Sequence, residues 1–414
     1  MSARVLLISG SYPPEIRSAS HLIFEMATEF RDRGHEITVL TSMPVYNLDE
    51  EAKRDTAYPE LAQEEGISVI RVGTLPRHKV NHLVRGFSEL LMPWQYLRAV
   101  RRHLRGALDA VVVSSPPLTL SWVGEQVKRR FDAPYLLSIQ DIFPKNAIDI
   151  GALRSPLIIR FSEWMERKAY RRADRITVHS QGNLTLLEER RGVPRKKLSI
   201  LPNWVSLEDY QVPADTTSPF RQRFGLEGKF VFLHAGVVGP SQNLELVVRA
   251  AARVKDLQEI RFLLIGDGTD SPRLERLTRE LGCSNVVWGP YVSREQYPAL
   301  VREMDVGLVS LSPGNETPVV PSKILGYMAS SVPVIGFLNK ESDAHSIIKS
   351  ANCGLTTISD DFEAAVEAIR KVYASKDKLR EWGENGRDFV STHFERKDSI
   401  DRLEALLRIG NQNK

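Results

Sequence analysis

One lysine lies at the expected start of a helix, within residues 320–335. Pro321 and Ser322 are residue types that favour the first positions of a helix, where free backbone N–H groups can face an anion. Lys323 adds a full positive charge, although the helix dipole disfavours cations at this end. An exposed lysine in a first turn is the alternative, but its unfavourable position favours an anionic partner. We therefore predict that Ser322 and Lys323 bind an anion such as a diphosphate.

Two glycine-containing loops follow apolar segments in the second half of the chain. Gly236 and Gly239 follow residues 230–235, and the sequence Gly-Asp-Gly at residues 266–268 follows residues 261–265. Glycine permits a sharp turn or a close approach of backbone to a phosphate. Neither loop completes the GxGxxG pattern or continues into Gly-Lys-Ser/Thr. We predict that Gly236 and Gly239 contact a phosphate, while a plain strand-to-helix turn stays open for the first loop and is favoured for the second.

Short apolar segments alternate with helical patterns along the chain, and this alternation predicts an α/β fold with parallel, doubly wound sheets. The predicted strands of the first half are residues 4–9, 35–41, 67–72, 110–114, 134–139, 175–179 and 198–201. The pattern then restarts, and the predicted strands of the second half are residues 230–235, 261–265, 285–288, 306–310 and 333–336. We therefore predict two Rossmann-like domains that face each other across a cleft, with ligands bound at the strand ends.

A polar stretch at residues 203–218 separates the two patterns. We predict an N-terminal domain of residues 1–203 and a C-terminal domain of residues 204–385. Residues 386–414 are expected to form a final helical segment that could pack back on the first domain. A chain of 414 residues is long enough for this organisation.

The composition is that of a globular protein from a reducing compartment. Hydrophobic residues make up 42% and charged residues 26% of the chain, which excludes a disordered or fibrous protein. Cys283 and Cys353 show no metal-ligand spacing, so we expect neither a disulfide framework nor a structural zinc site. The first apolar run is too short for a membrane span, and we expect no export signal and a cytoplasmic location.

Basic residues are concentrated between Arg77 and Arg105. This segment contains seven Lys and Arg residues and one acid, Glu89, together with apolar residues such as Trp94. Apolar side chains beside cations suit the surface of an anionic membrane, while a solvated helix face is the alternative, and both interpretations stay open. Nucleic acid is not expected as a partner because its usual motifs are absent.

The chain resembles the retaining nucleotide-sugar glycosyltransferases of family four, which have two Rossmann-like domains in the GT-B arrangement. The motifs that carry the resemblance span nearly the whole chain: Tyr12-Pro13-Pro14-Glu15, Gln140-Asp141-Ile142-Phe143-Pro144, Leu201-Pro202-Asn203, His234-Ala235-Gly236, Leu264-Ile265-Gly266-Asp267-Gly268 and Pro321-Ser322-Lys323. The chain looks most like the bacterial branch that builds O-antigen, capsule and exopolysaccharide. These motifs are specific for the superfamily and do not identify the sugar.

The resemblance implies transfer of a sugar from a UDP-sugar or a GDP-sugar to a hydroxyl of a glycan or polyprenyl-linked acceptor. Members of the family bind the donor through the second domain and the acceptor through the first, without an essential metal or another cofactor. Retention of configuration is commonly explained by front-face attack, in which the leaving phosphate helps to deprotonate the acceptor. Stabilising the diphosphate is then the main electrostatic task, which the resemblance assigns to Lys323, Gly236 and Gly239.

The chain departs from the family pattern in its phosphate-binding cations. Pro240 and Gln242 stand where many members have Arg and Lys. In the first loop, Arg17-Ser18 replaces a Gly-Gly pair. Either this loop cannot approach the donor in the usual way, or Arg17 supplies a missing donor-site cation.

A second departure concerns the acidic residues. Pro318 and Gly326 stand where many members carry paired glutamates, and Glu316 is out of register with both positions. Ser342-Asp343 falls near a small-acidic pair of the exopolysaccharide branch. The resemblance therefore implies that Asp343 holds the ribose hydroxyls of the donor.

Asp141 is the candidate acceptor residue. It follows the predicted strand at residues 134–139, at the carboxyl end where sites form. In the resemblance it lies beside a position often held by an acceptor-site histidine, which here is Gln140. We favour contact of Asp141 with an acceptor hydroxyl over a role as a helix cap or turn residue, and assign Gln140 and Glu15 to the acceptor site. His179 is equally a hydrogen-bonded histidine near a strand end or a site residue.

The leading hypothesis is a glycosyltransferase of bacterial surface polysaccharide synthesis, held peripherally at the inner face of the cytoplasmic membrane. A nucleotide-sugar epimerase has the same two-domain architecture but would convert a sugar nucleotide without an acceptor. A non-catalytic, sugar-nucleotide-binding subunit is suggested by the missing cations and glutamate. Both alternatives stay open.

Overall fold

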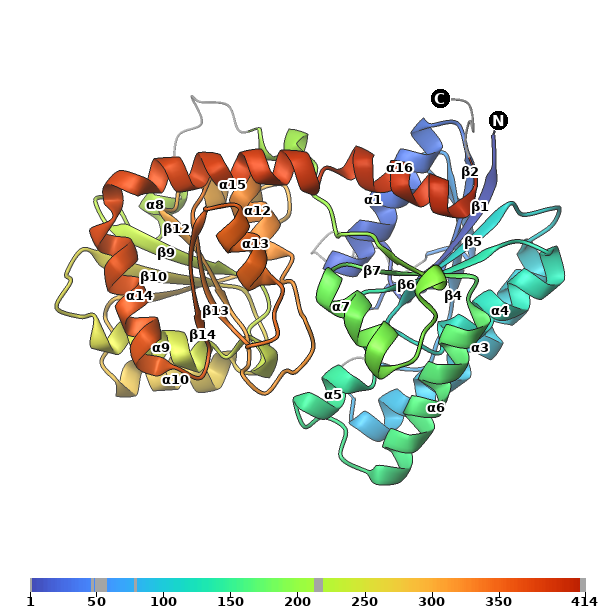
Figure 1. The fold of residues 1–414 in the computed structure, drawn as a ribbon, viewed down its shortest axis with the longest axis horizontal. Coiled ribbons are helices and arrows are strands. Elements are labelled where there is room, and N and C mark those ends of the chain that lie inside the picture. Colours follow the sequence, from blue (N-terminus) through green and yellow to red (C-terminus); the bar gives the residue numbers. More distant parts are fainter. Residues whose placement is uncertain (1, 46–47, 49–57, 78–79, 212–218, 410–414) are drawn as a thin grey trace. The chain divides into compact units, whose positions relative to one another are not determined.

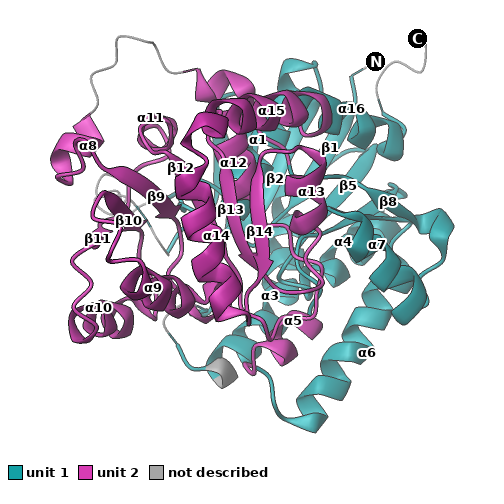
Figure 2. Cartoon of the chain, turned by 60° about the vertical axis from the view of Figure 1, so that its left-hand side comes forward, with its two compact units in different colours: residues 1–144, 153–203, 397–414 teal, residues 145–152, 204–396 magenta. Residues whose placement is uncertain are grey.

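The computed structural model describes residues 2–45, 48, 58–77, 80–211 and 219–409. The chain divides into two compact units, which Figure 2 shows in different colours. Unit 1 comprises residues 1–144, 153–203 and 397–414, and unit 2 comprises residues 145–152 and 204–396. The predicted α/β class with two parallel-sheet units is confirmed.

Unit 1 is built on an eight-stranded sheet (Figure 1). Its strands are β1 (Arg4–Ile8), β2 (Glu36–Ser42), β3 (Leu61–Glu64), β4 (Ile67–Val72), β5 (Ala110–Ser115), β6 (Tyr135–Ile139), β7 (Arg175–Val178) and β8 (Leu198–Ile200). The order across the sheet is β3-β4-β2-β1-β5-β6-β7-β8, with β3 antiparallel to β4 and the other neighbours parallel. The continuous apolar runs arise because helices cover both faces of the central strands, so that β5 and β6 are buried throughout.

The larger helices of unit 1 are α1 (Ser18–Asp32), α3 (His82–His103), α4 (Leu120–Phe131) and α6 (Pro156–Arg172). The connection from β7 to β8 contains α7 (Gln181–Thr185), the π-helical turn η1 (Leu186–Arg190) and η2 (Arg195–Lys197). Crossovers between parallel strands are right-handed, so connections that run in opposite directions along the sheet lie on opposite faces. Accordingly, α3, α4 and α6 share one face of the sheet and α1 covers the other (Figure 1).

Unit 2 contains six parallel strands in the order β11-β10-β9-β12-β13-β14. They are β9 (Phe230–Ala235), β10 (Ile260–Ile265), β11 (Val286–Gly289), β12 (Val306–Ser310), β13 (Val334–Leu338) and β14 (Gly354–Ile358). The helices are η3 (Leu207–Tyr210), α8 (Pro219–Arg223), η4 (Pro240–Gln242), α9 (Leu244–Arg253), α10 (Ser271–Glu280), α11 (Tyr297–Arg302), α12 (Lys323–Ala329), α13 (Ala344–Ser350), α14 (Phe362–Ala374) and η5 (Lys376–Lys378). This is the Rossmann strand order, which reverses between β9 and β12.

The last two helices belong to different units. Helix α15 (Leu379–His393) packs against α12 in unit 2, where a side chain at Gly383 would overlap the carbonyl oxygen of Ser331. Helix α16 (Arg396–Leu407) lies in unit 1 from its second residue onward. The division between the units falls after the first residue of α16, whereas the expected boundary at residue 386 lies inside α15.

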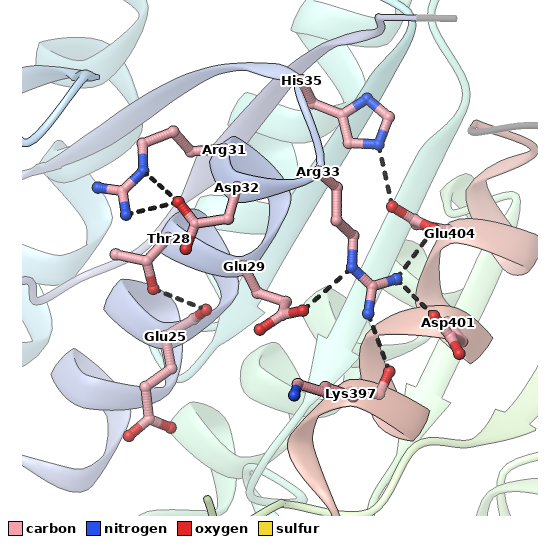
Figure 3. Close-up of polar contacts among 10 residues, drawn as sticks. All are labelled: Glu25, Thr28, Glu29, Arg31, Asp32, Arg33, His35, Lys397, Asp401 and Glu404. Atoms are coloured by element: carbon pink, nitrogen blue, oxygen red, sulfur yellow. Dashed lines mark hydrogen bonds and ion pairs between the residues drawn. The ribbon is translucent and has the colours of Figure 1, made fainter. Parts of the chain in front are cut away.

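Ionic contacts around Arg33 hold α16 on unit 1 (Figure 3). The guanidinium donates hydrogen bonds, at donor–acceptor distances between 2.5 and 3.2 Å, to the side chains of Glu29, Asp401 and Glu404 and to the carbonyl of Lys397. Burial lowers the pKa of Arg33, but the hydrogen bonds to Asp401 and Glu29 and the charges of Glu404 and Asp401 together raise that pKa. Nearby, Nε2 of His35 lies 3.0 Å from Oε1 of Glu404. The turn between α1 and β2 therefore fastens α16.

Within the described residues, no three His, Cys, Asp or Glu side chains gather as metal ligands. No described helix combines the length and apolar character needed to cross a bilayer. Cys283 and Cys353 are both buried and free.

Candidate active site

The carboxyl ends of β9 and β12 form the candidate donor site of unit 2. Ligands of a Rossmann sheet bind where the strand order reverses, and the reversal lies between these two strands. The loop after β9 contains Gly236 and Gly239, and the chain after β12 leads to Ser322 and Lys323 at the start of α12. The topology thus brings these predicted donor residues to one edge of the sheet.

Lys323 lies beside a buried histidine of β9. Its Nζ is 3.5 Å from Nε2 of His234, and the side chain of His234 is fully buried. Desolvation lowers the pKa of Lys323 to about 8. Burial, and then the charge of Lys323, lower the pKa of His234 well below its usual range, so the ring is neutral. Among the described residues no carboxylate pairs with Lys323, and an anion at Nζ would meet a partly desolvated cation.

Gly236 makes room for this lysine. A Cβ atom at Gly236 would lie 3.3 Å from Nζ and 3.4 Å from Cε of Lys323. The residue also has a φ of +144°, a conformation that side chains with a Cβ rarely adopt. The backbone conformation therefore favours glycine at this position, and a larger residue would also force the end of the Lys323 side chain to shift.

The Gly-Asp-Gly loop after β10 has a structural role. A side chain at Gly266 would overlap the carbonyl oxygen of Gly236, and one at Gly268 would overlap the carbonyl oxygen of Val238. The loops after β9 and β10 are joined by hydrogen bonds from the N–H of Gly236 to the carbonyl of Ile265 (2.9 Å) and from Val238 to Asp267 (3.0 Å). The second glycine loop thus supports the first, as the favoured turn interpretation predicts.

The other predicted donor positions are less constrained by their backbone. Gly239 precedes η4 with extended angles, a φ of −142° and a ψ of 174°, which any residue adopts. Ser322 is exposed at the N-cap position of α12, and no capping hydrogen bond involves its side chain. Both residues offer backbone or hydroxyl groups at the edge where Lys323 lies.

Asp343 occupies the N-cap position of α13 and is partly buried. The adjacent Ser342 donates from Oγ to the carbonyl of Val319 at 2.5 Å. Asn339, which is fully buried after β13, donates from Nδ2 to the carbonyls of Asn315 (2.7 Å) and Thr317 (3.2 Å). Sequence reasoning assigned no role to Asn339, because a polar residue after a strand does not reveal which loop it holds. These bonds fix the chain that leads into Lys323.

A short segment from the first half of the sequence also belongs to unit 2. Helix α5 (Lys145–Asp149) follows the Asp141 loop, and the ammonium group of Lys145 pairs with Asp149 and, at 2.6 Å, with Glu316. The backbone N–H of Glu316 donates to Oδ2 of Asp149 at 2.9 Å. Glu316, out of register with the family's glutamates, therefore anchors α5 to the chain between β12 and α12.

In unit 1, the loop after β1 carries Glu15 and Arg17. Arg17 stands at the N-cap position of α1 and is partly buried. The side chain of Glu15 is only 2% exposed, and its Oε1 accepts a hydrogen bond from the N–H of Val45 at 3.1 Å. A carboxylate buried in this way offers no surface to an acceptor, so we assign Glu15 to fastening the loop.

Asp141 and Gln140 follow β6 at the carboxyl edge of the unit 1 sheet. Asp141 is exposed, although desolvation by its surroundings raises the pKa of its carboxyl group. Helix α5 begins only at Lys145, so Asp141 does not occupy a cap position. Gln140 donates from Nε2 to Oγ of Ser138 at 3.3 Å. Just after β7, Nε2 of His179 lies 3.1 Å from Nδ2 of Asn183. This contact fits the interpretation of His179 as a hydrogen-bonded histidine near a strand end.

The basic segment forms most of α3, but its first cation is not at the surface. Arg77 is only 5% exposed and donates to the carbonyl of Gly10 (3.1 Å) and to Oγ of Ser42 (2.8 Å). It therefore braces the β1 loop from inside, and this correction removes it from the basic surface. Lys79 lies outside the described residues. The exposed cations are Arg85, Arg98, Arg101, Arg102 and Arg105.

Two protein families match the chain. The glycosyl transferase 4-like domain matches residues 20–204, and the glycosyl transferases group 1 domain matches residues 217–389. The chain is 25% identical over 342 residues to a protein named as a colanic acid biosynthesis glycosyl transferase, WcaI of Escherichia coli, with 79% of this chain and 81% of WcaI covered. It is 25% identical over 337 residues to a protein named as a glycosyltransferase, WbjE of Pseudomonas aeruginosa, with 80% of this chain and 82% of WbjE covered.

The fold is shared with solved structures. The structure of HepE from Anabaena in complex with UDP-glucose superimposes with a TM-score of 0.73 at 17% identity, covering 98% of this chain and 99% of HepE. Because the two matched domains follow one another over most of the sequence, the chain belongs to the glycosyltransferases that combine them. The predicted family and GT-B fold class are confirmed.

Proposed function

We propose that this glycosyltransferase moves a sugar, with retention of configuration, from a nucleotide donor to a hydroxyl of a lipid-linked glycan during synthesis of a bacterial surface polysaccharide. The observation that carries the proposal is the partly desolvated Lys323 beside Gly236, where the strand order of unit 2 reverses. The name of WcaI supports a polysaccharide product, and the HepE complex supports a nucleotide-sugar donor.

For the donor, we assign the diphosphate to the ammonium group of Lys323 and the backbone of the loop from Gly236 to Gly239. The hydroxyl of Ser322 and the first N–H groups of α12 add donors at the same edge. Asp343, at the start of α13, is assigned to the ribose hydroxyls. A UDP-sugar is the favoured donor, and a GDP-sugar is the alternative.

The proposed reaction exchanges one C–O bond for another at the anomeric carbon. The bond from this carbon to the β-phosphate oxygen breaks, and the acceptor oxygen bonds to the carbon on the same face. The hydroxyl proton passes to the departing phosphate oxygen, so that no protein base is consumed. Lys323 stabilises the charge that develops on the diphosphate, which lowers the barrier. The step requires no metal ion.

For the acceptor, we assign Asp141 and Gln140, because they follow a central strand at the carboxyl edge of unit 1. The exposed carboxylate of Asp141 can accept a hydrogen bond from the reacting hydroxyl. Arg17 is proposed to supply a cation to the diphosphate in place of those missing at Pro240 and Gln242. We place the enzyme at the inner face of the cytoplasmic membrane, with the basic helix α3 at the lipid surface.

The test is a thermal-shift panel of UDP, GDP, dTDP and ADP with and without EDTA, followed by transfer assays with the matching sugar nucleotides. At a given concentration, a bound diphosphate raises the melting temperature more the tighter it binds. We expect one base to dominate, EDTA to have no effect, and nuclear magnetic resonance of the product to show the donor's anomeric configuration. An inverted product would contradict the proposed chemistry.

The same assays separate the two alternatives. Nucleotide binding without transfer to any glycan acceptor would favour a non-catalytic subunit. Conversion of the sugar nucleotide into its epimer in the absence of acceptor would favour an epimerase.

A further inference from the structure

Helix α6 of unit 1 carries an exposed apolar stripe that the sequence analysis did not identify. Leu157, Phe161 and Trp164 follow one another at helical spacing and are 79%, 43% and 46% exposed, respectively. Ile158 widens the stripe. The rings of Phe161 and Trp164 stack with their centroids 5.8 Å apart. The first half of α6 thus presents an apolar stripe, beside which Arg160 is also exposed.

The second half of α6 presents cations. Arg167 and Arg171 are exposed, and the ammonium group of Lys168 lies 5.0 Å from the centre of the Trp164 ring. The acid Glu166 points inward instead, since its side chain is 1% exposed and bonds to Arg191 at 3.1 Å. The partly exposed Glu163 lies 3.9 Å from Arg167. The outward surface of the helix is therefore mainly apolar at its start and mainly positive toward its end.

Helix α3 has the same polarity along its axis. Residues 84–94 of α3 expose the apolar side chains of Val84, Phe87, Leu90 and Trp94, and among them Arg85 pairs with Glu89. Residues 98–102 expose Arg98, Arg101 and Arg102. The Trp94 ring is 62% exposed and rests edge-on against Trp122 of α4, with the centroids 4.9 Å apart. Helix α4 packs against both α3 and α6. The two striped helices therefore flank a common neighbour on one face of the sheet.

The direction of the helices brings their apolar halves to the same edge. Each connects two parallel strands and runs antiparallel to them, so its first turns lie at the carboxyl ends of the strands. In Figure 1, the first turns of α3 and α6 both lie at the lower end of unit 1. This is also the sheet edge that carries Asp141.

We infer that the apolar halves of α3 and α6 enter the interface of an anionic bilayer together, while their second halves bind the headgroups. The inference rests on the proposed function. It adds α6 as a second membrane-contacting helix and specifies which edge of the unit 1 sheet faces the bilayer. Aromatic and aliphatic side chains gain free energy in the acyl boundary, and cations near an anionic leaflet add attraction. A bilayer fits better than a protein partner because each apolar stripe continues into exposed cations. A membrane-bound acceptor sugar would then approach the Asp141 edge.

The experiment measures sedimentation of the full chain with vesicles of phosphatidylcholine, with and without phosphatidylglycerol. We expect binding to the anionic vesicles that weakens with salt. Phe161→Ser combined with Trp164→Ser should reduce the partition coefficient about tenfold, and Phe87→Ser should also reduce it. The matched control is Leu61→Ser, which removes an apolar side chain that is 50% exposed on the edge strand β3.

Charge is tested separately with Arg167→Gln combined with Arg171→Gln, against Arg380→Gln on α15 of unit 2 as control. The first pair should weaken binding to anionic vesicles, and the control should not. Unchanged binding of the Phe161/Trp164 variant, or negligible binding of the parent to both vesicle types, would overturn the inference. A parent dimer that this variant converts to a monomer, without vesicle binding, would instead assign the stripe to self-association. Melting shifts with nucleotide, measured without vesicles, report on the proposed function independently.

Discussion

Nζ of Lys323 lies 3.5 Å from Nε2 of His234, although 89 positions separate the two residues in the sequence. The imidazole is buried and neutral, so it packs beside the lysine without neutralising the charge of the ammonium group. The ammonium group keeps its charge near pH 7 but loses part of its hydration. Binding a phosphate restores the electrostatic stabilisation that burial removes.

Replacing Lys323 by Ala should weaken binding of the preferred nucleoside diphosphate and reduce kcat for transfer by about a hundredfold or more. The reason is that Lys323 stabilises the charge on the leaving group in the transition state. Isothermal titration and initial rates measure the two effects. Lys371→Ala, on the exposed surface of α14, is the matched control and should behave as the parent. Parent-like affinity and turnover of Lys323→Ala would remove this residue from the site.

The affinity for diphosphate should fall as the pH rises through about 8. The free lysine has a pKa of about 8, and a bound anion favours the protonated form, which raises this pKa in the complex. Protonation therefore favours binding, and above pH 8 each pH unit should cost up to about tenfold in affinity until the pKa of the complex is reached. Titration calorimetry between pH 7 and 9.5 measures this. The decline should be absent in Lys323→Ala, and a decline of equal slope in that variant would assign the titration to another group.

The two glycine loops should respond differently to alanine. Gly236→Ala should cost about 1–3 kcal/mol through backbone strain and should also weaken diphosphate binding, because its Cβ approaches Lys323. Gly266→Ala should cost more stability, since its Cβ overlaps the carbonyl oxygen of Gly236 and must force two loops apart. Urea unfolding and nucleotide titration separate the effects. Gly192→Ala is the control, with a φ of +65° and no atom within 4 Å of the added Cβ. Equal stabilities of all three variants would contradict the loop packing.

Arg17 tests the missing-cation hypothesis. Its φ of −147° and ψ of 146° suit any residue, so substitution introduces no backbone strain. If its guanidinium clamps the diphosphate through two parallel hydrogen bonds, Arg17→Lys should lower kcat because an ammonium group cannot reproduce that geometry. Arg17→Gly should also lower kcat, because it removes the charge. Rates are compared with donor and acceptor saturating, and Ser18→Gly controls for loop flexibility. A fully active glycine variant would show that the reaction does not use this cation.

Removing the charge of Arg33 should loosen α16. Arg33→Ala leaves the carboxylates of Glu29, Asp401 and Glu404 without the guanidinium that joins them (Figure 3). We expect a loss of about 1–3 kcal/mol in the free energy of unfolding of unit 1. Hydrogen exchange should show increased opening of α16, while α15 exchanges as in the parent. Arg380→Ala, whose partner Glu384 lies on its own helix, is a matched control. Unchanged protection of α16 would show that apolar packing alone holds it.

Most of the fold follows from local patterns in the sequence. Central strands such as β5 and β9 are buried on both faces, so their apolar runs are continuous and readily predicted. The edge strands β3 and β14 are not predicted, because they lack a continuous apolar run. The segment Leu61–Glu64 of β3 has little apolar character, and β14 is only partly buried, so their pairing depends on the neighbouring strand.

The candidate site could be predicted from the sequence only where a residue type by itself favours a particular local backbone conformation. The start of α12 could be predicted from Pro321 and Ser322, and the turn at Gly236 from glycine itself. His234 and Lys323 become neighbours only because strand β9 and helix α12, which are far apart in the sequence, come together in the fold. Likewise, the sequence places Arg77 among surface cations, whereas its guanidinium bonds to Gly10 after β1 and to Ser42 at the end of β2, both far earlier in the chain.

The order of segments in the two units has a consequence for synthesis on the ribosome. Unit 1 begins the chain, but α16, which Arg33 and His35 fasten, follows residues 204–396 of unit 2. Domains fold as units during translation once their segments have emerged. While residues 204–396 are being synthesised, α16 is therefore not yet available to pack against α1 of unit 1. Unit 2 can consequently finish folding before unit 1. A chain terminated before Lys397 would release a complete donor unit joined to an unfinished acceptor unit.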